Sequence, residues 1–327
     1  MSTPVNTILC KPVYLFKTSL LTKKVLFSFA VILCLSQAIS SPIALLLGII
    51  IALCIGNPYA QYNYKATNLL LKFAVIGLGF GMNFTSAFKA GSNGFLLTVG
   101  SIIITLSLGY LLGKLFKVEK KMAYLLAVGT AICGGSAIAA ISPVIDAKEN
   151  DISVSLSTVF ILNSIALFIF PLIGHLLSLN QTQFGLWCAI AIHDTSSVVG
   201  ASGKFGKEAL EIATTVKLAR ALWIIPVALL SATFFKVENS KVKIPWFIGL
   251  FIVAMAINTY FPSFQRYGEY LVVFSKSALI VTLFLIGSSL SYNAIKSIGL
   301  KPLFQGIILW TIITCSSLLA ICFMHFS

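Results

Sequence analysis

Residues 186–200 read LWCAIAIHDTSSVVG, an apolar stretch that contains one carboxylate, Asp194. Asp194 is the only one of the nine Asp and Glu residues that falls inside a long apolar stretch. A carboxylate near the centre of a bilayer costs several kcal/mol unless it is paired, hydrated or coordinating an ion, so membrane proteins that keep one there usually use it. The stretch therefore predicts a functional site inside a membrane, provided that the rest of the chain is a membrane protein.

The composition of the whole chain fits a membrane protein. Of its 327 residues, 58% are hydrophobic and only 10% are charged, and the mean hydropathy is +0.99. This leaves too little polar surface to coat a soluble domain of this size. The seven cysteines are scattered singly, without a metal-binding spacing, and are interpreted as reduced packing residues. Because no nucleophile motif, P-loop or dinucleotide signature is present, we expect no enzyme, no cofactor and no metal site.

Apolar runs long enough to cross roughly 30 Å of hydrocarbon divide the chain into eleven candidate spans. Their approximate limits are 25–40, 42–56, 66–84, 94–114, 122–145, 152–178, 183–201, 209–235, 244–261, 269–290 and 302–325. The sequence therefore predicts an all-α integral membrane protein. Residues 1–24 are expected to form a cytoplasmic segment, and residues 25–327 a single polytopic transmembrane domain.

The basic residues are distributed unevenly between alternate loops. If the amino terminus is cytoplasmic, fourteen lysines lie in inside segments, and the outside segments hold only Lys89, Lys148, Lys204, Lys207 and Arg266. This is the bias of the positive-inside rule, and it explains the net charge of +14 without a nucleic-acid partner. We therefore expect a cytoplasmic amino terminus and an external carboxyl terminus. The orientation assumes that residues 183–201 cross fully; a re-entrant hairpin there would change the parity.

Two pairs of short segments within the chain have similar sequences. These matches, here called internal echoes, indicate an internal repeat. Residues 76–83, IGLGFGMN, align with residues 286–293, IGSSLSYN, each at the end of a span. These spans are third and tenth, so they would point in opposite directions, as in the inverted-topology repeats of secondary transporters. Residues 132–136, ICGGS, align with residues 192–196, IHDTS, but those spans are fifth and seventh, so we interpret this echo as shared chemistry. Chance stays an alternative for the first echo, because Gly, Ser and Ile are common in membrane helices.

Both residues of the pair Gly134-Gly135 are expected to weaken the fifth span, and Ser136 could cap a new half-helix behind them. Unwound backbone at mid-membrane is tolerated only where protein or a water-filled cavity satisfies it, so such a break predicts a binding site. The alternative is close helix packing through small residues. In the seventh span, Thr195, Ser196 and Ser197 follow Asp194 and could cap a second half-helix, whose dipole would favour an anion.

Buried positive charge indicates the sign of the substrate. Arg220 lies deep in the eighth span, and Lys217 lies three residues earlier on the same helical face, whereas Lys72 and Lys276 are expected to reach the headgroups from span ends. We therefore expect an anionic substrate, with Asp194 and His193 carrying a coupling Na⁺ or proton. The predicted substrate-binding set is Arg220, Lys217, Gly134, Gly135, Ser136, Thr195, Ser196 and Asn83.

The chain resembles the YeiH-type family, whose members are labelled sulfate exporters. The resemblance covers nearly all of residues 25–325 and rests on GLGFGMN at 77–83, AICGGSAI at 131–138, AIHD at 191–194 and KLAR at 217–220. It implies a transporter of the bacterial inner membrane, distantly similar to bile-acid and arsenite transporters, with interrupted helices and with a core and a panel domain. The family pattern usually has Glu and Val-Ala after the histidine. Here Asp194 and Thr195-Ser196 follow it, so the carboxylate is kept but shortened.

Together these features predict a secondary transporter that moves a small anion, such as sulfate, a sulfonate or a carboxylate, across the cytoplasmic membrane. Its partners would be the anion and the lipid bilayer, and a homo-oligomer is compatible with the sequence. The alternative is a non-transporting membrane scaffold or sensor, in which Asp194 and Arg220 form a structural ion pair that holds helices together.

Overall fold

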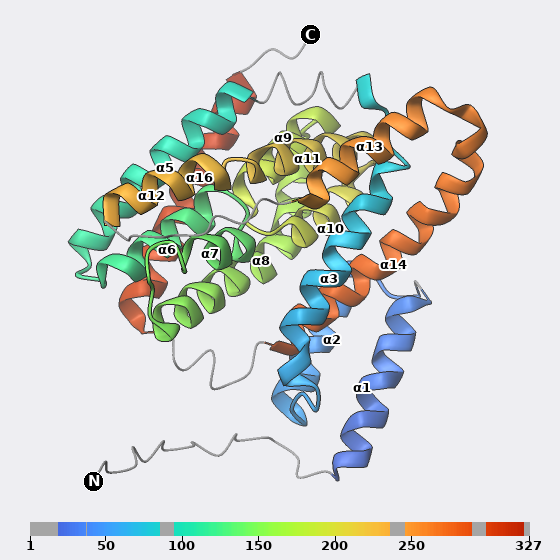
Figure 1. Ribbon diagram of the computed structural model, residues 1–327, viewed down its shortest axis with the longest axis horizontal. Helices are drawn as coiled ribbons and strands as arrows, with labels where there is room; N and C mark the ends of the chain where they lie inside the picture. The colour runs from blue at the N-terminus through green and yellow to red at the C-terminus, as the bar shows by residue number, and fades with distance from the viewer. Residues whose placement is uncertain (1–18, 37, 86–94, 236–245, 290–298, 324–327) are drawn as a thin grey trace.

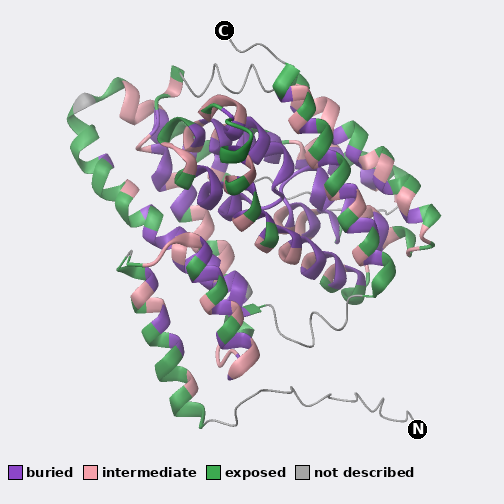
Figure 2. Ribbon diagram, turned by 180° about the vertical axis from the view of Figure 1, so that it is seen from behind, coloured by how far each residue is buried: buried purple, intermediate pink, exposed green. Residues whose placement is uncertain are grey.

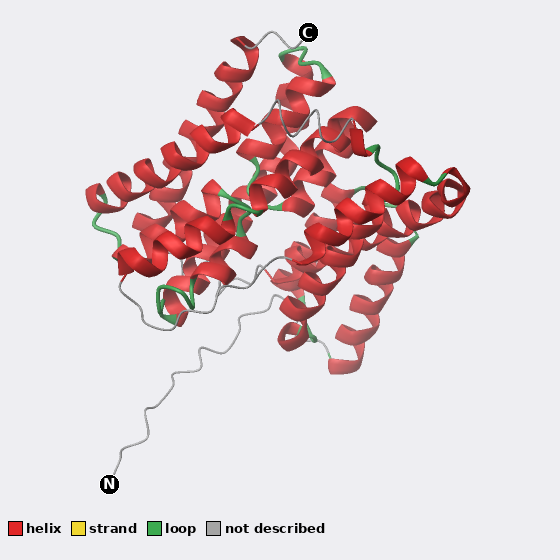
Figure 3. Cartoon of the chain, turned by 45° about the horizontal axis from the view of Figure 1, so that its top comes forward, coloured by secondary structure: helices red, strands yellow, loops and turns green. Residues whose placement is uncertain are grey.

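The computed structural model describes residues 19–36, 38–85, 95–235, 246–289 and 299–323. Every regular element within these ranges is a helix, and they contain no strand (Figure 3). The predicted all-α class is therefore confirmed. Figure 3 also shows loop segments in the interior of the bundle, in addition to those at its surface.

Each of the eleven predicted spans coincides with one helix or with two short helices. The continuous helices are α1 (Leu20–Leu35), α2 (Ser41–Cys54), α3 (Ala60–Gly79), α5 (Phe95–Leu115), α8 (Glu149–Leu176), α13 (Trp246–Tyr260), α14 (Gln265–Ser289) and α16 (Leu300–Phe323). The interrupted pairs are α6 (Lys120–Ala131) with α7 (Gly135–Ile141), α9 (Gln181–Ala191) with α10 (Thr195–Phe205), and α11 (Lys207–Ala221) with α12 (Ile224–Phe235). A 3-10 turn, Pro262–Phe264, precedes α14.

Five helical segments in the described part of the chain are long and apolar enough to cross a membrane, namely 95–115, 149–176, 207–235, 265–289 and 300–323. Two shorter apolar helices, Ser41–Cys54 and Trp246–Tyr260, fall below that length. The chain is thus built as a helical membrane protein, while the number of crossings stays a prediction.

Local sequence signals explain several of the helix boundaries. The Asn180 side chain accepts from Gln183 N, and the Gln183 side chain accepts from Asn180 N, so a capping box begins α9. Pro226 follows the interruption between α11 and α12, where it has no N–H to offer the preceding turn. Pro171, by contrast, lies within α8 without ending it.

The helices form two bundles that lie side by side (Figure 1). The first, called the α14 bundle, contains α1, α2, α3, α13 and α14, which pack mainly against one another. The second, called the hairpin bundle, contains α5 to α12 and α16. Contacts between the bundles are sparser and run chiefly from α10 to α14 and from α2 to α8. The chain starts in the α14 bundle, builds most of the hairpin bundle, and then returns.

Glycines allow close helix crossings within the α14 bundle. A Cβ on Gly48 of α2 would lie 2.2 Å from the Phe284 oxygen of α14, and a Cβ on Gly287 of α14 would lie 2.2 Å from the Leu45 oxygen of α2. Such small-residue contacts are the usual way in which helices associate in lipid, where no hydrophobic force drives them together. Large apolar side chains are instead exposed on the outer surface, including much of α1 (Figure 2), as a protein surrounded by lipid requires.

α3 and α14, which carry the first internal echo, run antiparallel. Asn63 near the start of α3 donates to the Leu285 oxygen near the end of α14, at 2.8 Å, whereas Gly81 just beyond α3 lies against Val272. The opposite directions agree with the expectation from the echo. Residues 290–293, the second half of the echo in α14, lie outside the described residues, and the inverted repeat stays a prediction.

Candidate functional site

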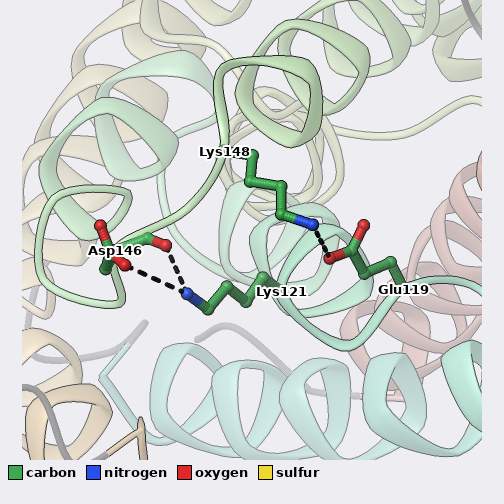
Figure 4. A network of polar contacts seen from close by, with 4 residues as sticks. All are labelled: Glu119, Lys121, Asp146 and Lys148. Carbon is green, nitrogen blue, oxygen red and sulfur yellow. Dashed lines mark hydrogen bonds and ion pairs between the residues drawn. The ribbon is translucent and has the colours of Figure 1, made fainter.

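The interruption between α6 and α7 forms a hairpin that enters the bundle and returns to the end from which it came. Lys148, which immediately precedes α8, places its Nζ 3.4 Å from Oε1 of Glu119, the residue before α6. Beside this pair, Lys121 Nζ lies 3.7 Å from Asp146 Oδ2 and also donates to the Asp146 main-chain oxygen (Figure 4). The start of the first arm and the end of the second arm therefore lie at the same end of the molecule, here called the Glu119 end. Residues 132–134 form the tip of the hairpin. Residues 122–145, predicted as one span, therefore fold back on themselves instead of forming one straight helix.

The interruption between α9 and α10 forms a second hairpin. The Phe184 ring near the start of α9 stacks on the Phe205 ring at the end of α10, with centroids 3.8 Å apart. Gln181 Oε1 also accepts from Glu208 N at the start of α11, at 3.1 Å. The start of α9 and the end of α10 therefore share one end of the molecule, here called the Gln181 end. Of the two interpretations for residues 183–201, this geometry agrees with the hairpin, and their position in the membrane stays a prediction.

The two hairpins enter from opposite ends. α8 starts beside the Glu119 end, and Gly174 near its other end packs against Phe184 and Phe205 at the Gln181 end. With a rise of 1.5 Å per residue, α8 is about 42 Å long, whereas the α6 and α9 arms reach only about 18 Å and 16 Å. The tips therefore meet near the middle of the molecule. The second internal echo, residues 132–136 and 192–196, marks these two tips.

Main-chain atoms of the two tips approach each other closely at Gly134. This residue has φ +64°, and a Cβ on it would lie 3.3 Å from His193 C and 3.4 Å from Asp194 N. Asn163 of α8 fixes the second tip, because its Oδ1 accepts from His193 N at 3.0 Å and from Asp194 N at 3.2 Å. Unwound main chain inside the bundle is thus satisfied by protein, as membrane-embedded backbone must be.

The Asp194 carboxylate caps α10. Its Oδ2 accepts from Ser196 N at 3.0 Å, from Ser197 N at 3.4 Å and from the Ser196 hydroxyl. The expectation that Thr195, Ser196 or Ser197 would cap this half-helix is wrong, because an aspartate one residue earlier is an equally good cap and adds a charge that the helix dipole favours. The N–H groups of Ser196 and Ser197 are thus occupied by this cap and are not available to a substrate anion.

The first hairpin lacks a corresponding side-chain cap. The N-cap residue of α7 is Gly134, and Ser136 lies within the first turn, so the prediction that Ser136 caps α7 is also wrong. Gly135 begins α7 and packs against Phe160 and Leu156 of α8. Only glycine readily adopts the positive φ that residue 134 needs to reverse the chain, which explains why the tip is built from a glycine pair.

Lys217 and Arg220 hold the carbonyl ends of the two entering arms. Lys217 Nζ donates to the Ile192 oxygen at 2.7 Å, and Arg220 donates through Nε to the Ala131 oxygen at 2.6 Å and through Nη1 to the Ile190 oxygen at 2.7 Å. Both side chains are fully buried. Helix carboxyl termini leave carbonyls without partners and carry partial negative charge, which cations compensate. Arg220 therefore joins α6 of one hairpin to α9 of the other.

Asp194 and Arg220 do not form an ion pair in the described part of the chain, where the ion pairs are the two at the Glu119 end. The structural pair on which the scaffold or sensor alternative depended is therefore absent. Direct binding of an anion by Lys217 and Arg220 stays a prediction. Their observed hydrogen bonds go to main-chain oxygens, although Arg220 Nη2 makes none.

A cavity of about 580 Å³ lies beside the tips, between the two bundles. Its polar lining comes from Asn68, Lys72, Cys133, Ser136 and Thr195. Its apolar lining comes from Leu71 and Val75 of α3, Ala139 and Ala140 of α7, Ala221, Ile224, Trp246 and Phe247. The cavity thus extends from both tips along α7, toward the Glu119 end.

Packed side chains join the second hairpin to the α14 bundle. Val199 of α10 packs in one apolar cluster with Leu78 of α3 and Leu279 of α14. At the next residue, a Cβ on Gly200 would lie 2.9 Å from Leu167 of α8 and 3.2 Å from Ser41 of α2. The second hairpin is therefore seated against the α14 bundle, whereas the first hairpin borders the cavity.

The predicted binding residues fall into three places. Ser136 and Thr195 line the cavity, while Gly134, His193 and Ser196 lie at the tips behind it. Asn83 does not belong to the site. It follows α3, where its Oδ1 accepts from Thr85 N at 3.0 Å, and it does not line the cavity.

Lys72 and Asn68 were missed as site residues. The sequence-based limits began this span at residue 66 and placed Lys72 near an end, but α3 runs from Ala60 to Gly79 and Lys72 lies in its middle. Its Nζ lies 6.0 Å from the centroid of the Trp246 ring on α13. A lysine at the centre of a spanning helix was the available signal, whereas Lys276 is exposed on α14.

Comparison with known proteins identifies the family. Residues 19–306 match the family model described as Conserved hypothetical protein 698. UPF0324 membrane proteins are similar along most of their length. That of Bacteroides thetaiotaomicron is 50% identical over 88% of this chain and 88% of its own length, and that of Bdellovibrio bacteriovorus is 50% identical over 91% of this chain and 94% of its own length. That of Vibrio vulnificus is 51% identical over 89% of this chain and 96% of its own length. No solved structure matches the chain. The chain belongs to the Conserved hypothetical protein 698 family of membrane proteins, the YeiH-type family that its sequence resembles.

Proposed function

We propose that this membrane protein is a secondary transporter that moves a small anion across the bacterial cytoplasmic membrane. The observation that carries the proposal is the pair of re-entrant hairpins, which enter from opposite ends and meet tip to tip beside a cavity. Irregular backbone in the middle of a membrane occurs where it lines a binding site, and discontinuous helices at the midplane are the usual site of secondary transporters. A scaffold has no need for this arrangement.

The charges around the cavity support an anion as the substrate. Lys72 is among the described lining residues, and none of these is a carboxylate. Behind the tips lie Lys217 and Arg220, and the Asp194 carboxylate there already caps α10. The positive charges thus exceed the negative ones, and an anion in the cavity would reduce the cost of keeping them inside the membrane.

Asp194 and His193 are the proposed carriers of the coupling ion, Na⁺ or H⁺. His193 is buried at the second tip, and neither of its ring nitrogens has a hydrogen-bond partner among the described residues. Asp194 has one carboxylate oxygen, Oδ2, occupied by the α10 cap. The two residues are adjacent and sit where the hairpins meet, so a change in their charge would act directly on the contact between the tips.

The hairpins also support a revised topology of nine crossings and two re-entrant segments. α6, α7 and α8 form one hairpin-and-crossing unit and α9 to α12 form another, entered from the opposite end, which supports an inverted repeat. Lys148 then joins the inside loops, so that fifteen basic residues lie inside and four outside, with the amino terminus in and the carboxyl terminus out. The positive-inside bias becomes stronger than with eleven crossings.

Cysteine labelling tests this topology. In a background without the native cysteines, we expect Lys121→Cys and Lys148→Cys to react with a membrane-impermeant maleimide from the same side of the membrane. Lys207→Cys should react only from the other side. Eleven crossings would instead place residues 121 and 148 on opposite sides, and that labelling pattern would refute the first hairpin.

Gradient-driven uptake into proteoliposomes tests the function. Asn is as good a helix N-cap as Asp, so Asp194→Asn should keep α10 and the fold while removing the charge. We expect the wild type to accumulate a labelled anion under a Na⁺ or H⁺ gradient, and Asp194→Asn to lose at least tenfold of this uptake with little change in thermal stability. Wild-type vesicles that take up no anion would contradict transport, and equal uptake by the variant would contradict the coupling role of Asp194.

A further inference from the structure

We infer that the ligand of the cavity is a small organic anion, an acid group on a short apolar chain, and that Lys72 is its charge partner. This inference rests on the proposed transport function and specifies its substrate class. It follows from two properties of the cavity, namely where its charged and polar groups lie and what covers the rest of its wall.

The acid group would bind where the two bundles meet. Lys72 comes from α3 of the α14 bundle, whereas the hydroxyl groups of Ser136 and Thr195 come from the two hairpin tips, and all three line the same cavity. Lys72 is half-buried and has no carboxylate within 4.0 Å among the described residues. A charged side chain kept inside a membrane protein without a counter-charge marks a substrate site. A ligand bound by these residues would therefore contact both bundles.

The remainder of the wall is apolar and favours a hydrocarbon chain. Leu71 and Val75 of α3, Ala140 of α7, Ile224 of α12 and Phe247 of α13 all line the cavity. A volume of about 580 Å³ is in the range of sites that hold organic ligands. The space beyond Lys72 therefore suits methylene groups.

Inorganic sulfate fits these surroundings poorly. It carries two charges on four oxygens, and transfer of such an ion from water is costly unless hydrogen-bond donors replace its hydration. In the described part of its wall, the cavity offers the Lys72 ammonium group and the polar groups of Asn68, Cys133, Ser136 and Thr195. An organic monoanion needs fewer donors, and burial of its chain adds favourable free energy.

The test measures ligand binding to the purified full-length protein, by the thermal stabilisation that a ligand specific for the folded state confers. The probes are sodium sulfate, methanesulfonate, butane-1-sulfonate and butyrate, with butylammonium as the cationic counterpart. We expect affinity to rise about fourfold for each methylene, the factor that corresponds to roughly 0.8 kcal/mol per buried CH₂. Butylammonium should not stabilise the protein.

Three variants assign the charge partner. Lys72→Gln should weaken butane-1-sulfonate binding at least tenfold, and Lys72→Arg should retain most of the affinity. Lys276→Gln removes an exposed lysine of α14 outside the cavity and should bind like the wild type. Loss of binding in Lys72→Gln with an unchanged unfolding temperature of the ligand-free protein separates a binding role from a folding role.

Any one of four results would overturn the inference. Sulfate could bind as tightly as butane-1-sulfonate, or affinity could be independent of chain length. Lys72→Gln could bind like the wild type, or none of the probes could bind. Uptake assays with the same anions separate this failure from failure of the proposed function. If sulfate is transported while the sulfonates and butyrate neither bind nor are transported, transport stands and the inference is wrong. If the organic anions bind with the expected trend but no anion is transported, the binding inference stands and transport is wrong.

Discussion

Replacing Arg220 with Ala is expected to destabilise the folded protein by about 4 kcal/mol or more. The guanidinium group donates to the main-chain oxygens of Ala131, Ala189 and Ile190, and Lys217 Nζ also donates to the Ala189 oxygen. Hydrogen bonds from a charged donor contribute roughly 1.5–3 kcal/mol each, and buried acceptors left without a partner add a desolvation cost. Because these oxygens end α6 and α9, both hairpin tips lose their common support. Thermal unfolding of the purified protein in detergent measures the effect.

Arg266 provides the control, since it is the other arginine of the chain and is exposed. Arg266→Ala should unfold within about 0.5 kcal/mol of the wild type, as expected for a surface substitution. Arg220→Lys should be intermediate, because an ammonium group lacks the planar fork that reaches both hairpins. If Arg220→Ala instead unfolds like the wild type but loses anion uptake, the sequence-based prediction of a substrate-binding arginine is correct, and the structural role assigned here is wrong.

Gly134→Ala is expected to cost about 2 kcal/mol of stability and to reduce anion uptake at least tenfold. The positive φ of +64° at this residue costs a side-chain-bearing residue about 1–3 kcal/mol. The new methyl group would also lie 3.3 Å from His193 C, tighter than an ordinary contact, so it would push the two tips apart. Because the tips border the cavity, uptake should fall even under conditions in which the variant stays fully folded. Paired measurements of unfolding and proteoliposome uptake compare the two.

Gly100→Ala is the matched control. A Cβ at Gly100 in α5 meets nothing within 4 Å, and Ala is the better helix former, so we expect unchanged uptake and a stability that is equal or slightly higher. Uptake in Gly134→Ala equal to that of Gly100→Ala would show that contact between the tips is not needed for transport.

The apolar runs of the sequence located the helices well, because each run must be buried in lipid or protein and the hydrogen bonds of a helix are local. The breaks at Gly134-Gly135 and at Asp194 were also predictable, since a glycine pair and a carboxylate both disfavour a continuous apolar helix. Lys217 and Arg220 were recognised as a buried basic face. The sequence could not show that their donors would reach main-chain oxygens, because those oxygens belong to residues 25 or more positions away.

The position of Lys72, which lines the cavity, was predicted wrongly because the start of its helix was misplaced. Lys72 was placed near the end of a span because the apolar run that contains it begins at residue 66. The helix itself begins earlier, at Ala60, and includes the polar residues before that run. Helix propensity and packing against α14, rather than hydropathy, determine where α3 begins. Only the folded chain places Lys72 on the wall of the same cavity as Ser136 and Thr195 of the hairpin tips.

By itself, the sequence determined that this protein is helical, membrane-embedded and interrupted at two places with similar residues. Only the tertiary structure decided the direction in which the chain leaves each interruption. A half-helix of 11 or 12 residues has the same local hydrogen bonds whether the next helix continues onward or turns back. The choice is made by contacts between residues distant in sequence, Lys148 with Glu119 at one hairpin and Phe205 with Phe184 at the other. Those contacts turn two predicted crossings into hairpins that meet at Gly134 and Asp194.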